Sequence, residues 1–309
     1  MMTVHRITRA IARHQRGFTL VEAVVVMVIT GIVAGTMVLF IRRPVQNYTD
    51  AAARADLSDA ADLALRRMAR ELRTALPNSV RLTATAAGQW WLEFIPTKAG
   101  GLYLAVENAP DPNADPLVGK PLSFTNQTVA PFNVIGPMPP VAVGDFFAIY
   151  NLGTGFDGAD AYARTNLAVI TGFDNDKRSI SYDSTLAGQS GKNPFRPVSG
   201  NVPNTSPRQR FQVVTRPVIY RCEGNANGKG TLTRSVAADF LVQPPLPLAS
   251  DGSLLANNVV ACDFTIGTSA SQQSGLIGLN LSLGRASLEG GNAVETITLS
   301  HQIHVDNTP

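Results

Sequence analysis

The first 80 residues contain two successive hydrophobic patterns. From Phe18 to Ile41 the chain is apolar or nearly so over 24 residues, and Glu22 is the one charged residue in that run. A helix of this length measures about 36 Å, enough to cross the hydrocarbon core of a bilayer. The run also exceeds the roughly 7–15 apolar residues of a secretory signal peptide. We therefore predict a membrane-spanning helix over 18–41. A plain membrane anchor fits the same pattern but leaves Glu22 unexplained.

The second pattern, over 42–77, is amphipathic. Its apolar residues recur every three or four positions, which is the period of one helical face. They are Leu57, Ala61, Ala64, Leu65, Met68, Leu72, Ala75 and Leu76. We expect this helical half to bury the apolar stripe against a sheet. It should end at Pro77, because a residue before proline disfavours the helical conformation. Pro44 should bend or loosen the helix between the two halves.

Beyond Pro77 the pattern changes to short β-strands. Candidate strands lie at 90–95, 102–106, 146–150, 168–173 and 178–182. Near the carboxyl end, 277–283 and 297–305 alternate apolar and polar residues, which indicates one buried and one solvated face. The segments 107–140 and 184–207 carry eight and four prolines and no strand pattern, so we interpret them as surface loops. The prediction is an α+β fold in which a long helix packs on an antiparallel sheet with long loop insertions, 78–309 forming one β-rich body.

The two cysteines fall on apolar faces of candidate strands. Cys222 alternates in phase with Val218 and Tyr220, and Cys262 in phase with Phe264. A disulfide between neighbouring strands is therefore expected if the body lies in an oxidising compartment. It would close a loop of about 40 residues and contribute roughly 3–4 kcal/mol by chain entropy. Two buried free thiols are the alternative.

Charge is concentrated at the amino terminus. The chain has 26 basic and 23 acidic residues, and four of the arginines precede Phe18 in a segment without acids. Basic residues before an apolar span favour a cytoplasmic amino terminus. The remaining chain has 22 basic and 23 acidic residues, a net charge of −1. A nearly neutral body gives no electrostatic support for nucleic-acid binding.

The segment from Arg16 to Glu22, RGFTLVE, resembles the amino-terminal signal of type IV pilins and pseudopilins. The resemblance implies a lollipop-like pilin fold and a basic leader, 1–17, which a prepilin peptidase removes by cutting between Gly17 and Phe18. It also implies N-methylation of Phe18, with Glu22 at the fifth mature position. The implied partners are the peptidase, other major and minor pilins, and an inner-membrane assembly platform. The body would be periplasmic before assembly and on the pilus or cell surface afterwards.

Glu22 has a physical interpretation within this resemblance. Cleavage would leave a cationic amine on Phe18, four residues or about 6 Å before Glu22 along a helix axis. A neighbouring helix shifted by roughly one turn would bring its amine to this carboxylate. Such a pair would fix the register of subunits, because misalignment would leave a buried charge unpaired. The simpler alternative is that Glu22 occupies the first helical turn, where the helix dipole favours a carboxylate by about 0.3–1 kcal/mol.

Short motifs in the body suggest a subgroup. They are ALPNSVR at 75–81, AIYN at 148–151, RF at 210–211, PVIYRC at 217–222 and HQIHVDN at 301–307. They resemble MshO-type minor pilins of the mannose-sensitive haemagglutinin (MSHA) pilus, which implies roles in pilus biogenesis and surface attachment. J-like pseudopilins of type II protein secretion and PilW-like minor pilins are the nearest alternatives.

No pattern predicts an enzyme, a cofactor or a metal site. His301 and His304 lie three apart on a predicted strand and so face opposite sides. The acidic segment 111–115 imitates a calcium loop, but Pro116 and Leu122 replace the required glycine and acid. A carbohydrate-binding adhesin is the alternative from another class, with exposed aromatic residues as its platform; the candidates are Trp90, Trp91, Phe146, Phe147 and Tyr150. A membrane-tethered hydrolase is a third, weaker hypothesis.

Overall fold

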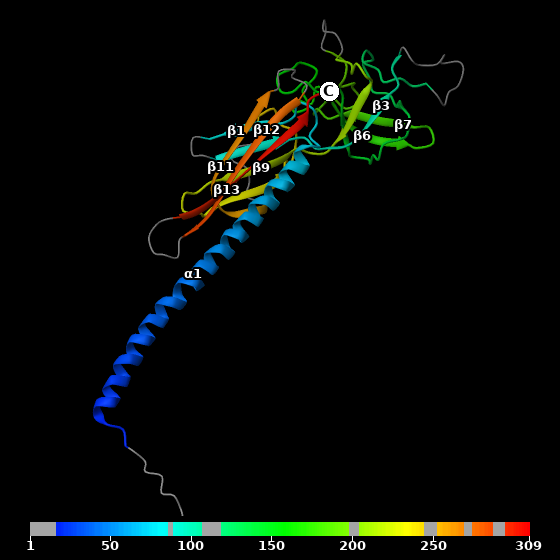
Figure 1. Ribbon diagram of the computed structural model, residues 1–309. Coiled ribbons are helices and arrows are strands. Elements are labelled where there is room, and N and C mark those ends of the chain that lie inside the picture. The colour runs from blue at the N-terminus through cyan, green and yellow to red at the C-terminus, as the bar shows by residue number, and fades with distance from the viewer. Residues whose placement is uncertain are drawn as a thin grey trace, which may run out of the picture. The chain divides into compact units, whose positions relative to one another are not determined.

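The computed structural model describes residues 17–85, 89–106, 119–197, 204–243, 252–268, 274–286 and 294–309. The chain divides into two compact units, Met1–Ala55 and Asp56–Pro309. Helix α1 (Leu20–Leu72) contributes to both units, and all strands of the described residues lie in the second unit (Figure 1). The long helix agrees with the two helical patterns in the sequence. The predicted leader 1–17 falls outside the described residues except for Gly17.

The helix passes through Pro44 and ends earlier than predicted. It is continuous at Pro44, where the proline removes one backbone hydrogen bond, and a bend or loosening at this position stays a prediction. At its other end the helix stops at Leu72 and not at Pro77. The amide of Leu76 donates to the carbonyl of Ile95 at 2.7 Å, and that of Thr97 donates to Thr74 at 2.7 Å. The segment before Pro77 is therefore held by the strands and leaves the helix early.

The carboxyl-terminal half of the helix lies on a seven-stranded antiparallel sheet. In spatial order the strands are β1 (Arg81–Ala84), β2 (Gln89–Phe94), β9 (Val218–Glu223), β10 (Gly230–Val236), β11 (Ser253–Thr268), β12 (Ser274–Ala286) and β13 (Val294–Asp306). The alternation predicted for 277–283 and 297–305 is observed. Leu279 and Leu281 are buried while Thr298 and Ser300 are exposed. The sheet thus has one apolar face, and the helix packs against it.

The helix buries the stripe that its sequence predicts. Its fully or almost fully buried residues are Leu57, Ala61, Ala64, Leu65, Met68, Ala69 and Leu72. They share one core with sheet residues such as Leu92, Phe94 and Tyr220. Each large apolar side chain removed from water contributes about 1.5–3 kcal/mol. Three of these residues are alanines, whose short side chains allow the helix backbone to approach the sheet closely.

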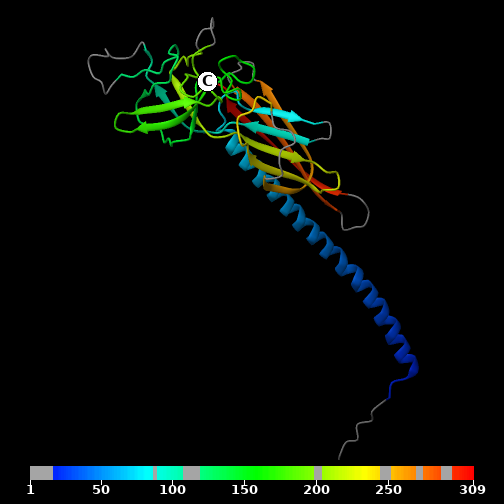
Figure 2. The same cartoon turned by 180° about the vertical axis from the view of Figure 1, so that it is seen from behind.

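A closed six-stranded antiparallel barrel is the part of the fold that was not predicted. Around the barrel the strands are β3 (Thr97–Tyr103), β4 (Phe132–Ile135), β7 (Ser179–Ser184), β6 (Leu167–Asp174), β5 (Phe146–Ala148) and β8 (Arg210–Val214) (Figure 2). Strand β4 lies inside the segment 107–140, which we expected to be a loop. The strand is four residues long and pairs with β3 and β7 over two residue pairs each, too little for an alternation pattern to be visible.

Aromatic rings fill the barrel. The ring centroid of Phe132 lies 5.5 Å from that of Phe147, 5.6 Å from that of Phe211 and 5.9 Å from that of Tyr182. The Phe147 and Tyr182 centroids are 5.5 Å apart, in an edge-to-face arrangement. Such pairs add about 0.5–1.5 kcal/mol each beyond area burial. The barrel therefore has a core of its own, separate from the core under the helix.

The barrel is inserted at the turn of a hairpin in the larger sheet. Strands β2 and β9 are neighbours, and Phe94 pairs with Val218 at the point where the chain leaves the sheet and returns. A small third core lies where barrel and sheet join, and it includes Leu76, Ile95 and Val214. A domain inserted through two adjacent strand ends leaves the register of the surrounding sheet intact.

Arg81 connects several segments at this junction. Its Nε donates to Glu93 Oε2 at 2.7 Å, and its two terminal nitrogens donate to the carbonyls of Leu241 and Val242 at 2.8 and 2.7 Å. The guanidinium carbon lies 3.6 Å from the centroid of the Tyr162 ring, which belongs to a loop between barrel strands. Burial raises the pKa of Glu93, and the Arg81 guanidinium offsets only part of this rise. One arginine thus joins β1, β2, the chain after β10 and the barrel.

The disulfide links Cys222 to Cys262, with the two Cα atoms 6.4 Å apart, within the usual range. The expected pairing of neighbouring strands is wrong, because β10 lies between β9 and β11. The pairing of β10 with β11 ends at Gly230 and Val259 and is interrupted by register shifts. Cys262 lies beyond that end, where β11 also contacts β9. At Gly230 an added Cβ would collide with the carbonyl oxygens of Glu223 and Val259, so glycine permits the close approach.

Replacing Arg81 by Met is expected to destabilise the second unit by about 3–5 kcal/mol, because Glu93 would remain buried without its partner. A carboxyl group whose pKa is higher in the folded than in the unfolded state makes the protein less stable as pH rises. The deficit in the free energy of unfolding should therefore grow with pH. Urea unfolding of the full-length protein in detergent, followed by tryptophan fluorescence, measures it. The R81M/E93Q double variant should recover part of the loss; no recovery would contradict the ion-pair interpretation.

Glu71 fastens the helix to the sheet by accepting from Nε of Arg234 in β10 at 2.8 Å, and it also accepts from Nε of Arg67, one turn away on the same helix, at 3.2 Å. Burial acts to raise the pKa of Glu71, but the hydrogen bonds from Arg234, Tyr220 and Arg67 outweigh it and lower the pKa below its ordinary value. We expect E71Q to cost about 0.5–1 kcal/mol at pH 7. The deficit should begin to shrink as pH falls below about 4.3, where the carboxyl group of the unfolded chain is protonated, and it should vanish once pH lies below the lowered pKa of the folded state. D176N, at an exposed turn, is the control; a deficit that is constant across pH would contradict the prediction.

Candidate functional site

The segment Gly17–Thr19 precedes the helix and is exposed. An added Cβ at Gly17 would meet no atom within 4 Å. Thr19 caps the helix: its Oγ1 accepts the amide hydrogen of Glu22 at 3.2 Å, and its carbonyl accepts that of Ala23 at 3.1 Å. The bond between Gly17 and Phe18 thus lies in non-helical, accessible chain two residues before a fixed helix start. Peptide cleavage requires such a segment, since a helix hides its backbone groups.

Sequence reasoning missed the capping role of Thr19. The signal was present, because Thr19 and Glu22 form the T-x-x-E pattern of a capping box. In this pattern the threonine side chain bonds to the amide three residues later, as the structure shows. The cap explains why the helix begins at Leu20 and not at Phe18, where the apolar run begins.

Glu22 lies in the first turn of the helix and is exposed. Its carboxylate has no hydrogen-bond or ion-pair partner among the residues that the structure describes. The helix amino terminus provides a favourable but weak field for this charge. Glu22 is therefore available to a cation from outside the chain.

The helix surface on both sides of Glu22 is apolar and uncovered. Leu20–Val38 has a mean hydropathy of 2.2, and none of it is buried within the protein. Exposed fractions reach 81% at Leu20 and 73% at Phe18 and Met27. By length and composition this is the one helix of the described residues that is able to cross a membrane. Lipid or other apolar helices must cover it, since soluble proteins rarely expose so large an apolar surface.

Comparison with family models shows one match: residues 12–38 fit the prokaryotic N-terminal methylation motif. The chain carries the prepilin-type cleavage and methylation motif of type IV pilins and pseudopilins. Searches of curated proteins and of solved structures found no match to the chain. The prepilin motif implies processing by prepilin peptidase and assembly with other pilins. The apolar helix that bears it indicates anchoring in the inner membrane before assembly.

The structure brings together only some of the predicted site residues. Gly17, Phe18 and Glu22 lie within one short segment of the first unit, whereas Cys222 and Cys262 lie in the second unit. The residues predicted for cleavage, methylation and subunit register therefore lie at one end of one helix. The disulfide acts elsewhere, as a cross-link inside the β-rich body.

The aromatic residues considered for a sugar-binding platform are buried or half-buried. Trp91 and Phe147 are 4% and 0% exposed. The half-buried Trp90, Phe146 and Tyr150 pack against core residues; Trp90 lies 6.3 Å from Phe264 and Phe146 lies 5.0 Å from Phe240 between ring centroids. The adhesin hypothesis therefore has only half-buried rings to rest on.

Few of the described residues suggest catalysis or metal binding. His301 is half-buried and faces Asp62 of the helix, while His304 is exposed on the other side of β13. Within the described ranges no group of three or more His, Cys, Asp or Glu side chains forms a metal site. The segment 111–115, which imitates a calcium loop, lies outside the described residues. Pilin-type proteins are generally structural subunits without enzymatic activity.

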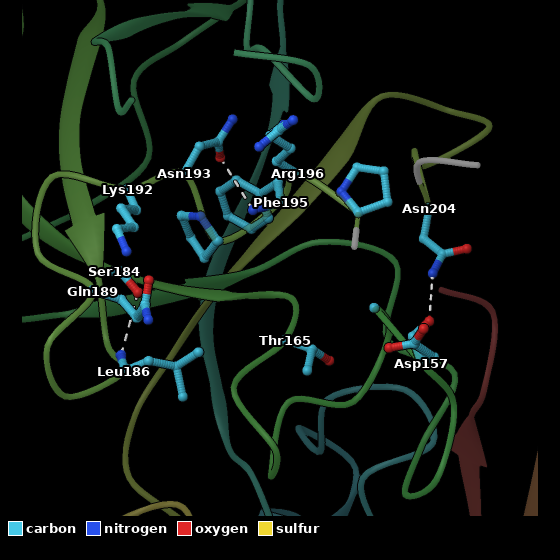
Figure 3. A pocket seen from close by; sticks show the side chains of 13 residues that line it. Asp157, Thr165, Ser184, Leu186, Gln189, Lys192, Asn193, Phe195, Arg196 and Asn204 are labelled. Carbon is cyan, nitrogen blue, oxygen red and sulfur yellow. Dashed lines mark hydrogen bonds between the residues drawn. The ribbon is translucent and has the colours of Figure 1, made fainter. Parts of the chain in front are cut away.

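A hollow of about 450 Å³ lies beside the barrel (Figure 3). Most of its polar groups hold the surrounding loops. Asn193 Oδ1 accepts from the amide of Phe195 at 3.1 Å, and Asn204 Nδ2 donates to the carbonyl of Asp157 at 2.8 Å. Lys192 and Arg196 are exposed cations at its rim. Its lining contains no histidine or cysteine. The arrangement stabilises the loops around the hollow.

Proposed function

We propose that the protein is a minor pilin of an MSHA-like type IV pilus. In this proposal prepilin peptidase cuts between Gly17 and Phe18, the amine of Phe18 is methylated, and the subunit enters or primes a filament that attaches cells to surfaces. The observation that carries the proposal is the uncovered apolar helix preceded by the prepilin motif. The apolar surface needs lipid before assembly and other helices after it.

In this proposal Glu22 sets the axial register between subunits. Its carboxylate lacks a partner among the described residues, and cleavage at Gly17 creates a cation only about 6 Å away along the axis. In the apolar interior of a filament an unpaired carboxylate is costly, so a neighbour supplying its amine would be selected over a misaligned one. The disulfide and the Arg81 junction would keep the body folded outside the cytoplasm.

A type II secretion pseudopilin of the J-like kind is the second candidate, because the prepilin motif occurs in both systems. Both candidates predict the same processing and differ in the machinery that uses the subunit. Deleting either assembly system of the host and locating the protein in sheared surface filaments separates them.

Mass spectrometry of the native protein should find an amino terminus at Phe18 that carries one methyl group. G17V should retain the leader, because a branched side chain next to the scissile bond hinders the peptidase while leaving the helix cap of Thr19 unchanged. V21I, inside the first turn, is the matched control and should be processed normally. Native protein that begins at Met1 would overturn the proposal.

Glu22→Gln should lower the amount of protein in filaments by about tenfold or more, because the amide cannot neutralise the buried amine of a neighbour. Immunoblots of sheared filaments, with processing verified by mass, measure it. If Glu22 acted only on the helix dipole, the change would be modest, since that effect is about 0.3–1 kcal/mol. Near-normal incorporation of E22Q would therefore remove the register role.

A further inference from the structure

The second half of α1 has an exposed stripe opposite the face that it buries. Its residues follow one another at steps of three or four and are all exposed: Asp56, Asp59, Leu63, Arg66, Arg70 and Arg73. The exposed fraction of Leu63 is 69%. Residues with this spacing lie on one face of a helix. The stripe is acidic at its first end, apolar in the middle and basic at its last end.

Four charges of the stripe are unpaired within the described part of the protein. Arg66 pairs with Asp62 one turn away, and Arg67 pairs with Glu71. Neither an ion pair nor a side-chain hydrogen bond is found for Asp56, Asp59, Arg70 or Arg73. Two carboxylates and two guanidinium groups thus face outward with no partner among the described residues.

The basic end of the stripe borders an open hollow of about 510 Å³. Arg66, Ala69, Arg70 and Arg73 line it from the helix, and His301 lines it from the edge strand β13. The hollow leaves room for side chains from another molecule beside Arg70 and Arg73. Its lining favours carboxylates over any other side chain.

The spacing of the unpaired charges is matched. Asp56 and Asp59 are three residues apart, as are Arg70 and Arg73, and fourteen residues separate each acid from the corresponding arginine. Fourteen residues of helix measure about 21 Å and make nearly four turns. The two charge pairs are too far apart to meet on one helix, yet they point in similar directions. A second helix displaced by that distance would match both pairs at once.

Two copies of this chain anchored by Leu20–Val38 in one membrane run parallel, because the same end enters the bilayer. At equal depth identical residues lie at the same height, so Asp56 and Asp59 would face their counterparts and Arg70 and Arg73 theirs. Like charges in contact repel. Displacing one copy outward by about 21 Å replaces both repulsions by attractions.

We propose that this stripe is a docking surface for a second, parallel copy of the chain that is displaced along the helix axis by about fourteen residues. The carboxylates of Asp56 and Asp59 on the outer copy then meet Arg70 and Arg73 of the inner copy. The contact is heterologous, because the acidic end of the stripe on one copy meets the basic end of the stripe on the other. It rests on the proposed function and concerns a different neighbour from the one that meets Glu22, where the offset is about 6 Å.

Charge reversal in the full-length protein tests the contact. The acid-reversed variant D56R/D59R and the base-reversed variant R70D/R73D each place like charges opposite one another at the displaced position. Each should reduce the amount of protein in sheared filaments by about tenfold. The variant with all four changes restores opposite charges with exchanged signs and should return to within about twofold of the wild type.

The matched control is D176R/D263R, which reverses two exposed carboxylates on the barrel and the outer face of the sheet and should leave assembly unchanged. Resistance to trypsin and the state of the disulfide verify that each variant is folded. Normal assembly of either half-reversed variant would overturn the proposal, as would a fourfold variant no better than its halves. If the wild type itself keeps its leader and never leaves the membrane, the proposed function fails first, and mature Phe18 in filaments separates the two failures.

Discussion

The rest of the molecule depends on one constraint: the apolar surface of Leu20–Val38 has no cover within the protein. Water cannot solvate such a surface without cost, so it must lie against lipid or against other apolar helices. A helix is suited to both environments, because its backbone hydrogen bonds are satisfied within the segment. This permits the same residues to sit first in a bilayer and then in a protein assembly.

The other half of the same helix meets the opposite requirement. From Leu57 to Leu72 it carries a stripe that is buried against the seven-stranded sheet, and Glu71 fixes it there through Arg234 of β10. The face that remains exposed carries unpaired charges in two separate groups. Burial therefore holds one face of the helix to its own body, while the opposite face stays exposed.

The body is built so that a large insertion does not disturb this arrangement. The barrel enters where β2 and β9 are already paired, and it has its own aromatic core. Arg81 joins the two parts with hydrogen bonds to Glu93, Leu241 and Val242 and with its stacking on Tyr162. An arginine suits this role because its planar group donates in several fixed directions at once.

Sequence alone determined the features that depend on local periodicity and local chemistry. The apolar run, the buried stripe from Leu57 to Leu72 and the alternation in β12 and β13 were predicted, because a period of 3.6 or 2 is visible in a short window. The prepilin motif was also visible, because it consists of residues that are adjacent in the sequence. The tertiary structure decided what depends on distant segments. The closed barrel, the early helix end at Leu72 and the bridge from Cys222 in β9 to Cys262 in β11 arise from pairings between residues far apart in sequence, and short strands such as β4 carry too few residues to reveal such pairings.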